Sequence, residues 1–509
     1  MVLQHPPPTS MEGSSSNEHI VMLPMMAHGH LIPFLSLARE IHRRKGFTVT
    51  IASTPLNIQY LRSTAGTEIK FAELSFGNAD RGLLPDAENT ENLTLDQIVN
   101  IFSASERLEA PFRQFLSEIV EKEGKPPLCI ISDVFLGWAV GVAESMGTVN
   151  VTFTTCGAYG TLAYMSLWLN LPHRKTESEE FTLPGFPERC RFHISHLHRF
   201  VRMADGTDSW SRFLQPQISN SLQSFGCLCN TVEEIEPLGL ECLRKFMKIP
   251  VWPIGPLLPS ALLKKSPASA GQFYKHRAGK KPGMSMEKCL EWLDSQKPNS
   301  VLYVSFGSQN SISESHMKEL ASGLEGSGIP FIWVIRPPLG FDFRGEFRSE
   351  WLPEGFEQRT TEKNQGLLVK NWAPQLEILS HKSTGAFVSH CGWNSVMESL
   401  SQGVPIIGWP MAAEQTYNSK MLVEEMGVSV ELTRGLQSEI GGEEVKRVIK
   451  MVMEEKGKGG EMRKKAAEIA ERIAAATNDE EEGDDKGSSI QALDDFVSAV
   501  VRKRREIRT

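Results

Sequence analysis

The stretch 372–415 constrains the fold more than any other part of the chain. Two short apolar runs within it, 385–389 and 405–410, have the length and composition of buried parallel strands. A helical pattern starts at Ser395, shortly after the first run, and Gly392 permits a sharp turn between them. This order of strand, turn, helix and strand predicts a parallel α/β sheet whose ligands collect at the carboxyl ends of its strands.

The polar and aromatic residues of this stretch indicate what such a ligand contains. Asn394 and Ser395 suit a helix N-terminus, where free N–H groups and the positive end of the helix dipole attract an anion. Glu398 lies one turn further and can reach a hydroxyl beside that anion, while Trp372 offers a flat face to a planar ring. Residues 414–415, Glu-Gln, follow the second strand. The array therefore predicts a ring, a ribose, a diphosphate and a polar sugar along one strip.

This stretch closely resembles, over its whole length, the nucleotide-sugar signature box of the plant family 1 UDP-glycosyltransferases. The resemblance runs from about His19 to Phe496 and implies the GT-B fold, in which two Rossmann-like α/β domains face each other across a cleft. It also implies a role for each matching residue. Trp372 would stack on uracil, Ala373 would pair with it through its backbone, and Gln375 and Glu398 would hold the ribose; His390, Asn394 and Ser395 would hold the diphosphate, with Gly392 at the turn between them; Trp393, Glu414 and Gln415 would meet the sugar; Thr155 would contact the sugar or the phosphate, and Ser308 the phosphate.

Alternating strand and helix patterns extend this architecture over most of the chain, which predicts two doubly wound halves. The first strand–helix turn has no GxGxxG motif, which argues against a dinucleotide-binding first half. We expect a disordered tail over 1–18, an acceptor-binding domain over 19–258, a linker over 259–285, a UDP-sugar-binding domain over 286–480, and a last helix within 487–509 that in the family crosses back onto the first domain.

Glycosyl transfer needs a base for the acceptor hydroxyl and stabilisation of the departing diphosphate. His30 follows the first predicted strand within a Gly-His pair, which is where the family has its base; His28, two residues earlier, is a competing candidate. Asp133 ends the strand 129–133 and can fix the histidine tautomer and stabilise the imidazolium. The sequence leaves open whether His28 tunes the base.

The acceptor is expected to lie in the first domain, in an apolar and aromatic pocket. Such a pocket suits a flavonoid or another phenolic, or a terpenoid, and the sequence does not choose the hydroxyl. The residues predicted to line it are Met25, Phe135, Trp138, Tyr159, Met165 and Trp168.

Bulk composition excludes several other classes. A net charge of −8 argues against a nucleic-acid binder, and no apolar run approaches the roughly 20 residues that span a bilayer. The first 17 residues lack the apolar core of a signal peptide, and the eight cysteines form no CxxC pairs. We therefore expect a cytoplasmic protein with reduced thiols, a monomer with no metal and no cofactor.

These patterns and the family resemblance together predict an inverting, metal-independent O-glucosyltransferase that uses UDP-glucose and a small plant metabolite. Trp393 and Gln415 favour glucose, because Gln at the last position of the box usually accompanies glucose in the family. A UDP-sugar epimerase of the same fold is one alternative. A non-catalytic UDP-sugar binder is the other, and it should lack a His–Asp pair.

Overall fold

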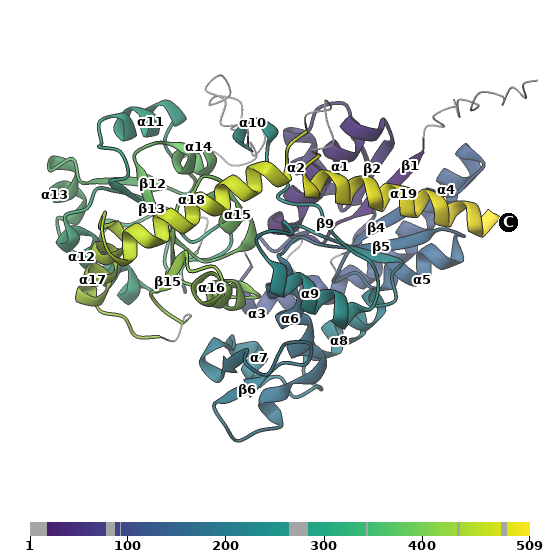
Figure 1. The fold of residues 1–509 in the computed structure, drawn as a ribbon, viewed down its shortest axis with the longest axis horizontal. Helices are drawn as coiled ribbons and strands as arrows, with labels where there is room; N and C mark the ends of the chain where they lie inside the picture. The colour runs from purple at the N-terminus through teal and green to yellow at the C-terminus, as the bar shows by residue number, and fades with distance from the viewer. Residues whose placement is uncertain are drawn as a thin grey trace, which may run out of the picture.

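The computed structural model describes residues 18–77, 87–91, 93–263, 283–342, 345–434, 438–479 and 486–508. Apart from residue 18, the predicted disordered tail lies outside the described residues, as does most of the predicted linker, 264–282. Two parallel sheets, each covered by helices, form the two halves of the molecule (Figure 1).

The first sheet has seven parallel strands in the order β3-β2-β1-β4-β5-β8-β9. Their order reverses between β1 and β4, and the crevice at such a switch point is where open α/β sheets bind ligands. The strands are β1 His19–Leu23, β2 Thr48–Ser53, β3 Lys70–Glu73, β4 Cys129–Asp133, β5 Val149–Thr154, β8 Gly226–Cys229 and β9 Val251–Pro253.

Helices on both faces of this sheet, and one hairpin, complete the first domain. The hairpin pairs β6 (Glu180–Thr182) with β7 (Arg191–His193). The helices are α1 His28–Lys45, α2 Pro55–Thr64, α3 Leu95–Ala104, α4 Glu109–Glu123, α5 Trp138–Ser145, α6 Ala158–Asn170, α7 Arg199–Met203, α8 Ser209–Ser221 and α9 Pro237–Met247, with the short α10 Ser260–Leu263 after β9.

The second sheet has six parallel strands in the order β12-β11-β10-β13-β14-β15, with its switch point between β10 and β13. Its strands are β10 Val301–Ser305, β11 Phe331–Ile335, β12 Gly366–Lys370, β13 Thr384–Ser389, β14 Ile406–Gly408 and β15 Ser429–Glu431. Its helices are α11 Met286–Asp294, α12 Glu314–Ser327, α13 Phe356–Glu362, α14 Gln375–Ser380, α15 Trp393–Ser401, α16 Gln415–Glu424, α17 Gly442–Met453 and α18 Lys458–Ala476.

One hydrophobic core runs continuously from the first domain into the second. Tyr159 and Leu162 of α6 belong to the same buried cluster as Met397 of α15 and Tyr417 of α16. Gly160 permits the close approach of α6 to α16, because a Cβ there would lie 2.2 Å from Asn418 Oδ1. Packed side chains therefore fix the relative position of the two domains.

The last helix, α19 (Ser488–Arg508), follows α18 and lies on the first domain (Figure 1). Phe496 is buried in the core of the first domain, with its ring 5.5 Å from the Trp252 ring. Arg504, near the basic end of this helix, is buried and donates to the Pro127 carbonyl at 2.6 Å. No helix among the described residues is both long and apolar enough to span a membrane.

Candidate active site

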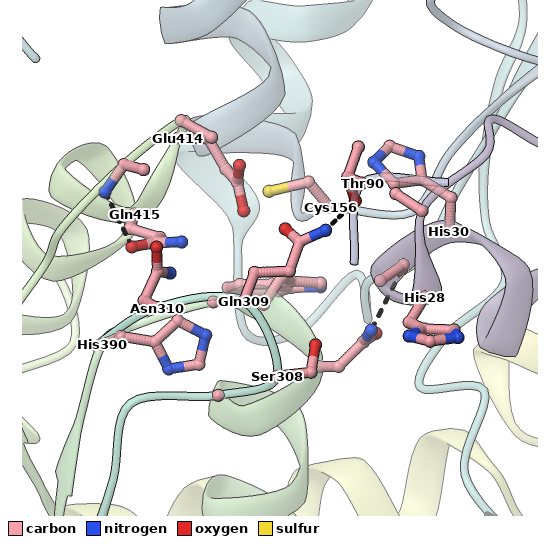
Figure 2. Close-up of a pocket in the computed structure, with 18 of the residues that line it drawn as sticks. His28, His30, Thr90, Cys156, Ser308, Gln309, Asn310, His390, Glu414 and Gln415 are labelled. Atoms are coloured by element: carbon pink, nitrogen blue, oxygen red, sulfur yellow. Dashed lines mark hydrogen bonds between the residues drawn. The ribbon is translucent and has the colours of Figure 1, made fainter. Parts of the chain in front are cut away.

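A cavity of about 330 Å³ lies where the carboxyl ends of the two sheets face each other. Residues of both domains line it, and Figure 2 shows His28 and His30 of the first domain opposite Glu414 and Gln415 of the second. The switch points of the two sheets both open onto this space, because β1 ends shortly before His28 and β13 ends directly before His390.

His30 and Asp133 meet at the switch point of the first sheet. His30 lies in the first turn of α1, and Asp133 is the last residue of β4, which pairs with β1. His30 Nδ1 donates to Asp133 Oδ2 at 2.6 Å, while Asp133 Oδ1 accepts the Phe135 N–H at 3.1 Å. The carboxylate is fully buried, so it holds the ring with Nδ1 protonated and leaves Nε2 as the nitrogen that can take a proton.

The charges around His30 favour its protonated form. Burial lowers the pKa of His30, but the charge of Asp133, its hydrogen bond and the charge of Glu414 together outweigh burial, so that the pKa is raised from its ordinary value. Thr155 Oγ1 lies 3.5 Å from His30 Nδ1, which brings this predicted donor residue beside the base. The site can therefore accept a proton from a hydroxyl and stabilise the charge that results.

His28 occupies a different environment. It is buried, its ring lies 4.4 Å from the Tyr60 ring, and its Nδ1 lies 3.6 Å from Glu91 Oε2. His28 therefore packs against α2 and a loop of the first domain, whereas His30 is the histidine that contacts Asp133.

The turn after β13 has the predicted shape, with a different residue in the strained position. Cys391 adopts a left-handed backbone, φ 62°, and Gly392 does not, φ −62°. Gly392 is needed for space instead, because a Cβ would lie 2.4 Å from His390 Nε2, and a Cβ on Gly307 would lie 2.5 Å from the same atom. Burial and the charge of Arg336 lower the pKa of His390 to about 4, so its ring is neutral at pH 7.

Helix α15 begins at Trp393, with Gly392 as its N-cap, so the first N–H groups of the helix open onto the cavity beside His390. Ser395 and Ser308 also line the cavity. The Asn394 amide is already engaged, because Nδ2 donates to the Gly29 carbonyl of the first domain at 3.1 Å.

The predicted ribose and base residues lie at the other end of the strip. Trp372, Ala373 and Gln375 line the cavity, and Gln375 Oε1 accepts from the Tyr303 hydroxyl at 3.2 Å. Glu398, predicted to hold the ribose, is not among the described residues that line the cavity. It is buried behind Gln375 and accepts from Gln375 Nε2 at 2.6 Å, so it orients that amide.

The predicted sugar readers are all at the cavity, but two of their polar atoms are committed elsewhere. Gln415 Oε1 accepts the N–H groups of Met411 and Ala412 at 3.0 and 2.9 Å, which leaves only Nε2 for a ligand. Trp393 donates its indole N–H to the Asn230 carbonyl at 2.6 Å. Burial raises the pKa of Glu414, whose carboxylate lines the cavity near Gln415 (Figure 2).

The acceptor end of the cavity is walled by aromatic rings. The rings of Phe135 and His30 are 5.9 Å apart, and the wall continues through Phe102 to Trp210, whose ring lies 5.3 Å from that of Phe102. Phe135, Met165 and Trp168 line the cavity as predicted. Further side chains that line this end and were not predicted include Ile98, Phe102, Tyr164, His198, Phe200, Val201 and Trp210.

Three predicted acceptor residues, Met25, Trp138 and Tyr159, are not among the described residues that line the cavity and belong to the buried core. Met25 is fully buried within the main cluster of the first domain. Tyr159 packs its ring 4.8 Å from that of Phe186, and Trp138 packs its ring 5.9 Å from that of Phe112. Each of the three lies just after a strand or in the first turn of a helix. The spacing of apolar residues in the sequence does not show whether such a side chain faces the protein core or the cavity.

Comparisons with known proteins account for this arrangement. The family model "Glycosyltransferase, N-terminal domain" matches residues 17–259, and "UDP-glucoronosyl and UDP-glucosyl transferase" matches residues 275–465. UDP-glycosyltransferase 92A1 of Arabidopsis thaliana is 43% identical over 504 residues, which cover 97% of this chain and 99% of that protein. The chain belongs to the plant family 1 UDP-glycosyltransferases.

This UDP-glycosyltransferase is also 45% identical to Crocetin glucosyltransferase 3 of Crocus sativus, over 87% of the chain and 92% of that protein. The solved Glycyrrhiza uralensis UGT73P12, complexed with glycyrrhetinic acid 3-O-monoglucuronide, superposes with a TM-score of 0.79 at 28% identity, covering 97% of this chain and 96% of that one. Phytolacca americana UGT2, complexed with UDP-2fluoro-glucose and pterostilbene, gives 0.74 at 27% identity, covering 95% and 100%. The predicted GT-B fold is confirmed, and the activity is glycosyl transfer from a UDP-sugar to a small molecule.

The cavity of this UDP-glycosyltransferase contains polar residues that the sequence reasoning missed. Arg336 directly follows β11 and donates from Nε to the Asn371 carbonyl at 3.0 Å, beside Trp372. Its place after a strand of the sheet was a usable signal, the same one that identified Asp133. Gln309 donates its amide across the cleft to the Thr90 hydroxyl (Figure 2). Thr90 lies in a loop with no such signal.

Proposed function

We propose that this UDP-glycosyltransferase transfers glucose, with inversion, from UDP-glucose to a hydroxyl of a small, flat, hydrophobic metabolite. The observation that carries the proposal is the 2.6 Å contact of His30 Nδ1 with buried Asp133, at the junction of the donor strip and the aromatic pocket. In the reaction, His30 Nε2 takes the hydroxyl proton as the acceptor oxygen bonds to the anomeric carbon. The bond from that carbon to the diphosphate oxygen breaks, and UDP leaves with the electron pair. A single displacement inverts the anomeric centre.

A phenolic, such as a flavonoid, is the proposed acceptor class. Phe102, Phe135 and Trp210 present rings to one another over the length of the pocket, and flat ligands suit such surfaces. The cavity-lining residues of the acceptor end carry no Lys, Arg, Asp or Glu among the described residues, so a neutral acceptor is favoured over a charged one. A terpenoid is the second choice, because it is apolar but not flat.

Glucose is the proposed sugar. Glu414 offers carboxyl oxygens to the sugar hydroxyls, and Gln415 offers its Nε2 donor. The Gln415 oxygen is not available as an acceptor, because it is bonded to the N–H groups of Met411 and Ala412. The carboxyl oxygens of Glu414 also disfavour a second carboxylate in the same place, because two carboxyl groups cannot both ionise there at low cost. The names of the Crocus sativus relative and of the Phytolacca americana complex point to the same sugar.

We propose that the departing diphosphate is stabilised by protein groups without a metal. The N-terminus of α15 faces the cavity beside His390, and Arg336 adds a positive charge nearby. Glu414 is the single carboxylate that lines the described part of the cavity, so the paired carboxylates that usually hold Mg²⁺ are not found together there.

The test is UDP release from four donors against a panel of acceptors. UDP-glucose should be used fastest with a planar phenol, UDP-galactose and UDP-xylose weakly, and UDP-glucuronate hardly at all; terpenoid alcohols and charged phenols extend the acceptor panel. Faster use of another donor would refute the sugar assignment. Conversion of UDP-glucose to UDP-galactose without acceptor would indicate an epimerase, and tight UDP-glucose binding without turnover a non-catalytic binder.

A further inference from the structure

The donor helix α15 is bonded directly to the first domain at its first residue. Trp393 Nε1 donates to the Asn230 carbonyl at 2.6 Å, and both residues are 3% exposed. An N–H···O contact of this length is a well-formed hydrogen bond, and water cannot replace it at a buried position. Breaking it therefore leaves a buried donor unpaired. The start of α15 therefore follows the position of the Asn230 carbonyl.

The side chain of Asn230 fixes that carbonyl in place. Its Nδ2 donates to the Thr155 carbonyl at 3.2 Å, and its Oδ1 accepts the Leu257 N–H at 3.0 Å. One buried amide thus joins the segments that follow β5, β8 and β9 at the edge of the first domain that faces α15. Both ends of the amide are used, so a shorter side chain loses both bonds.

A seat for the Trp393 ring lies next to this amide, at the start of α6. A Cβ on Gly157 would lie 2.6 Å from the Trp393 ring and 2.4 Å from Glu236 Oε2. Gly157 has an ordinary backbone conformation, so the glycine is required for space. Buried Glu236 holds the start of α6 by accepting the N–H groups of Ala158 and Tyr159 at 2.9 and 3.0 Å.

The same segment leads to the base. Thr155, whose carbonyl Asn230 holds, has its hydroxyl 3.5 Å from His30 Nδ1. On the other side of the base, Asn394 Nδ2 donates to the carbonyl of Gly29, the residue before His30. The first two residues of α15 are therefore attached to the first domain on either side of His30.

We infer that Asn230 is a positioning residue for glycosyl transfer, which acts through Trp393. It holds the N-terminus of α15, and with it the diphosphate and the anomeric carbon, at a set distance from His30 and the acceptor oxygen. This inference rests on the proposed function. Because a misplacement of about 1 Å can cost about 10²-fold in rate, the bond matters for turnover more than for donor affinity.

The first test is Asn230→Ala in the full chain. We expect kcat to fall about 10- to 100-fold, while the KM for UDP-glucose and the Kd for UDP change less than about twofold. The fraction of UDP-glucose hydrolysed instead of transferred should rise, because water competes with a displaced acceptor. Trp393→Phe removes the indole N–H and keeps an aromatic ring, so it should show the same changes. If Asn230→Ala does not fold, Trp393→Phe is the variant that tests the inference.

Two matched variants separate positioning from loss of stability. Gln365→Ala removes a buried amide that donates to the Leu324 carbonyl at 3.0 Å. Gln365 directly precedes β12, at the amino end of the strand and away from the cavity. Trp409→Phe shrinks a fully buried indole whose N–H has no hydrogen-bond partner among the described residues. Both should lower Tm and keep kcat and the hydrolysed fraction near wild type. Wild-type kcat in Trp393→Phe, or a loss in Asn230→Ala no larger than in Gln365→Ala, would overturn the inference.

A failure of the proposed function gives a different result. In that case the wild-type protein transfers no sugar to any acceptor. Thermal unfolding then tests whether Asn230 and Trp393 together attach α15 to the first domain. The double variant Asn230→Ala/Trp393→Phe should then lose less Tm than the sum of the single variants, because both break one link. Additive losses would overturn the inference.

Discussion

Replacing Asp133 by asparagine tests the His30–Asp133 pair without changing the size of either side chain. Asp133 Oδ1 accepts the Phe135 N–H at 3.1 Å, and Oδ2 accepts from His30 Nδ1 at 2.6 Å. If the new amide oxygen stays on the Phe135 N–H, the NH₂ group faces Nδ1, and the ring proton must move to Nε2. The imidazole then cannot accept the proton of the acceptor hydroxyl.

The magnitude follows from the opposite orientation of the amide. Turning the oxygen toward His30 restores the useful tautomer but leaves the partly buried Phe135 N–H unpaired, which costs about 1–3 kcal/mol. At about 1.36 kcal/mol per tenfold, the active arrangement becomes roughly 5- to 150-fold rarer. We therefore expect Asp133→Asn to lower kcat about 10- to 100-fold.

The pH profile of kcat/KM provides a second reading of the same variant. His30 must be neutral to accept a proton, so activity is lost as the pH falls through its pKa. In the wild type, burial lowers the pKa of His30 but Asp133 and Glu414 outweigh it. Without the carboxylate, the pKa falls and the acidic limb moves to lower pH.

Asp479→Asn is the matched control. It removes a carboxylate that accepts from Arg44 at 2.6 Å, and neither residue lines the cavity. It should leave both the rate and the limb unchanged. An Asp133→Asn enzyme with wild-type kcat, or with an unmoved acidic limb, would refute the assignment of Asp133.

Three further predictions use the same assay. His30→Ala should lower the rate about 10²–10⁴-fold with UDP affinity nearly intact. If His28→Ala is inactive and His30→Ala keeps wild-type turnover, His28 is the base instead. EDTA should leave the rate unchanged, and a strict need for Mg²⁺ or Mn²⁺ would contradict the proposed stabilisation by α15 and Arg336. Gly307→Ala should weaken UDP binding in titration calorimetry, because its Cβ would lie 2.5 Å from His390 Nε2 and its φ of 76° suits glycine; unchanged affinity would show that the His390 ring does not help to bind the diphosphate.

The sequence was enough to predict the two sheets, the cleft and the His30–Asp133 pair. Most strands of the two sheets are short apolar runs. The rule that ligands collect at the carboxyl ends of parallel strands places His30 and Asp133 together. That rule also applies to Arg336, which directly follows β11 and lines the cavity.

The remaining features depend on contacts between distant segments. Glu398 has the right place in α15 but lies behind Gln375, and Tyr159 turns into the core while Tyr164 of the same helix lines the cavity. A helical pattern gives the spacing of the apolar residues but not which apolar face meets another helix and which meets a ligand. Trp393 matches the family box, yet its partner Asn230 is known only once the two domains are seen together.

The path of α19 has a practical consequence for building chimeric enzymes. Phe496 and Arg504 complete the first domain, although they follow the second domain in the chain. A hybrid joined once, within 259–285, would combine the first domain of one parent with the last helix of the other, and the mismatch would fall inside a core. A hybrid with a second junction before Ser488 would return each first domain to its own α19.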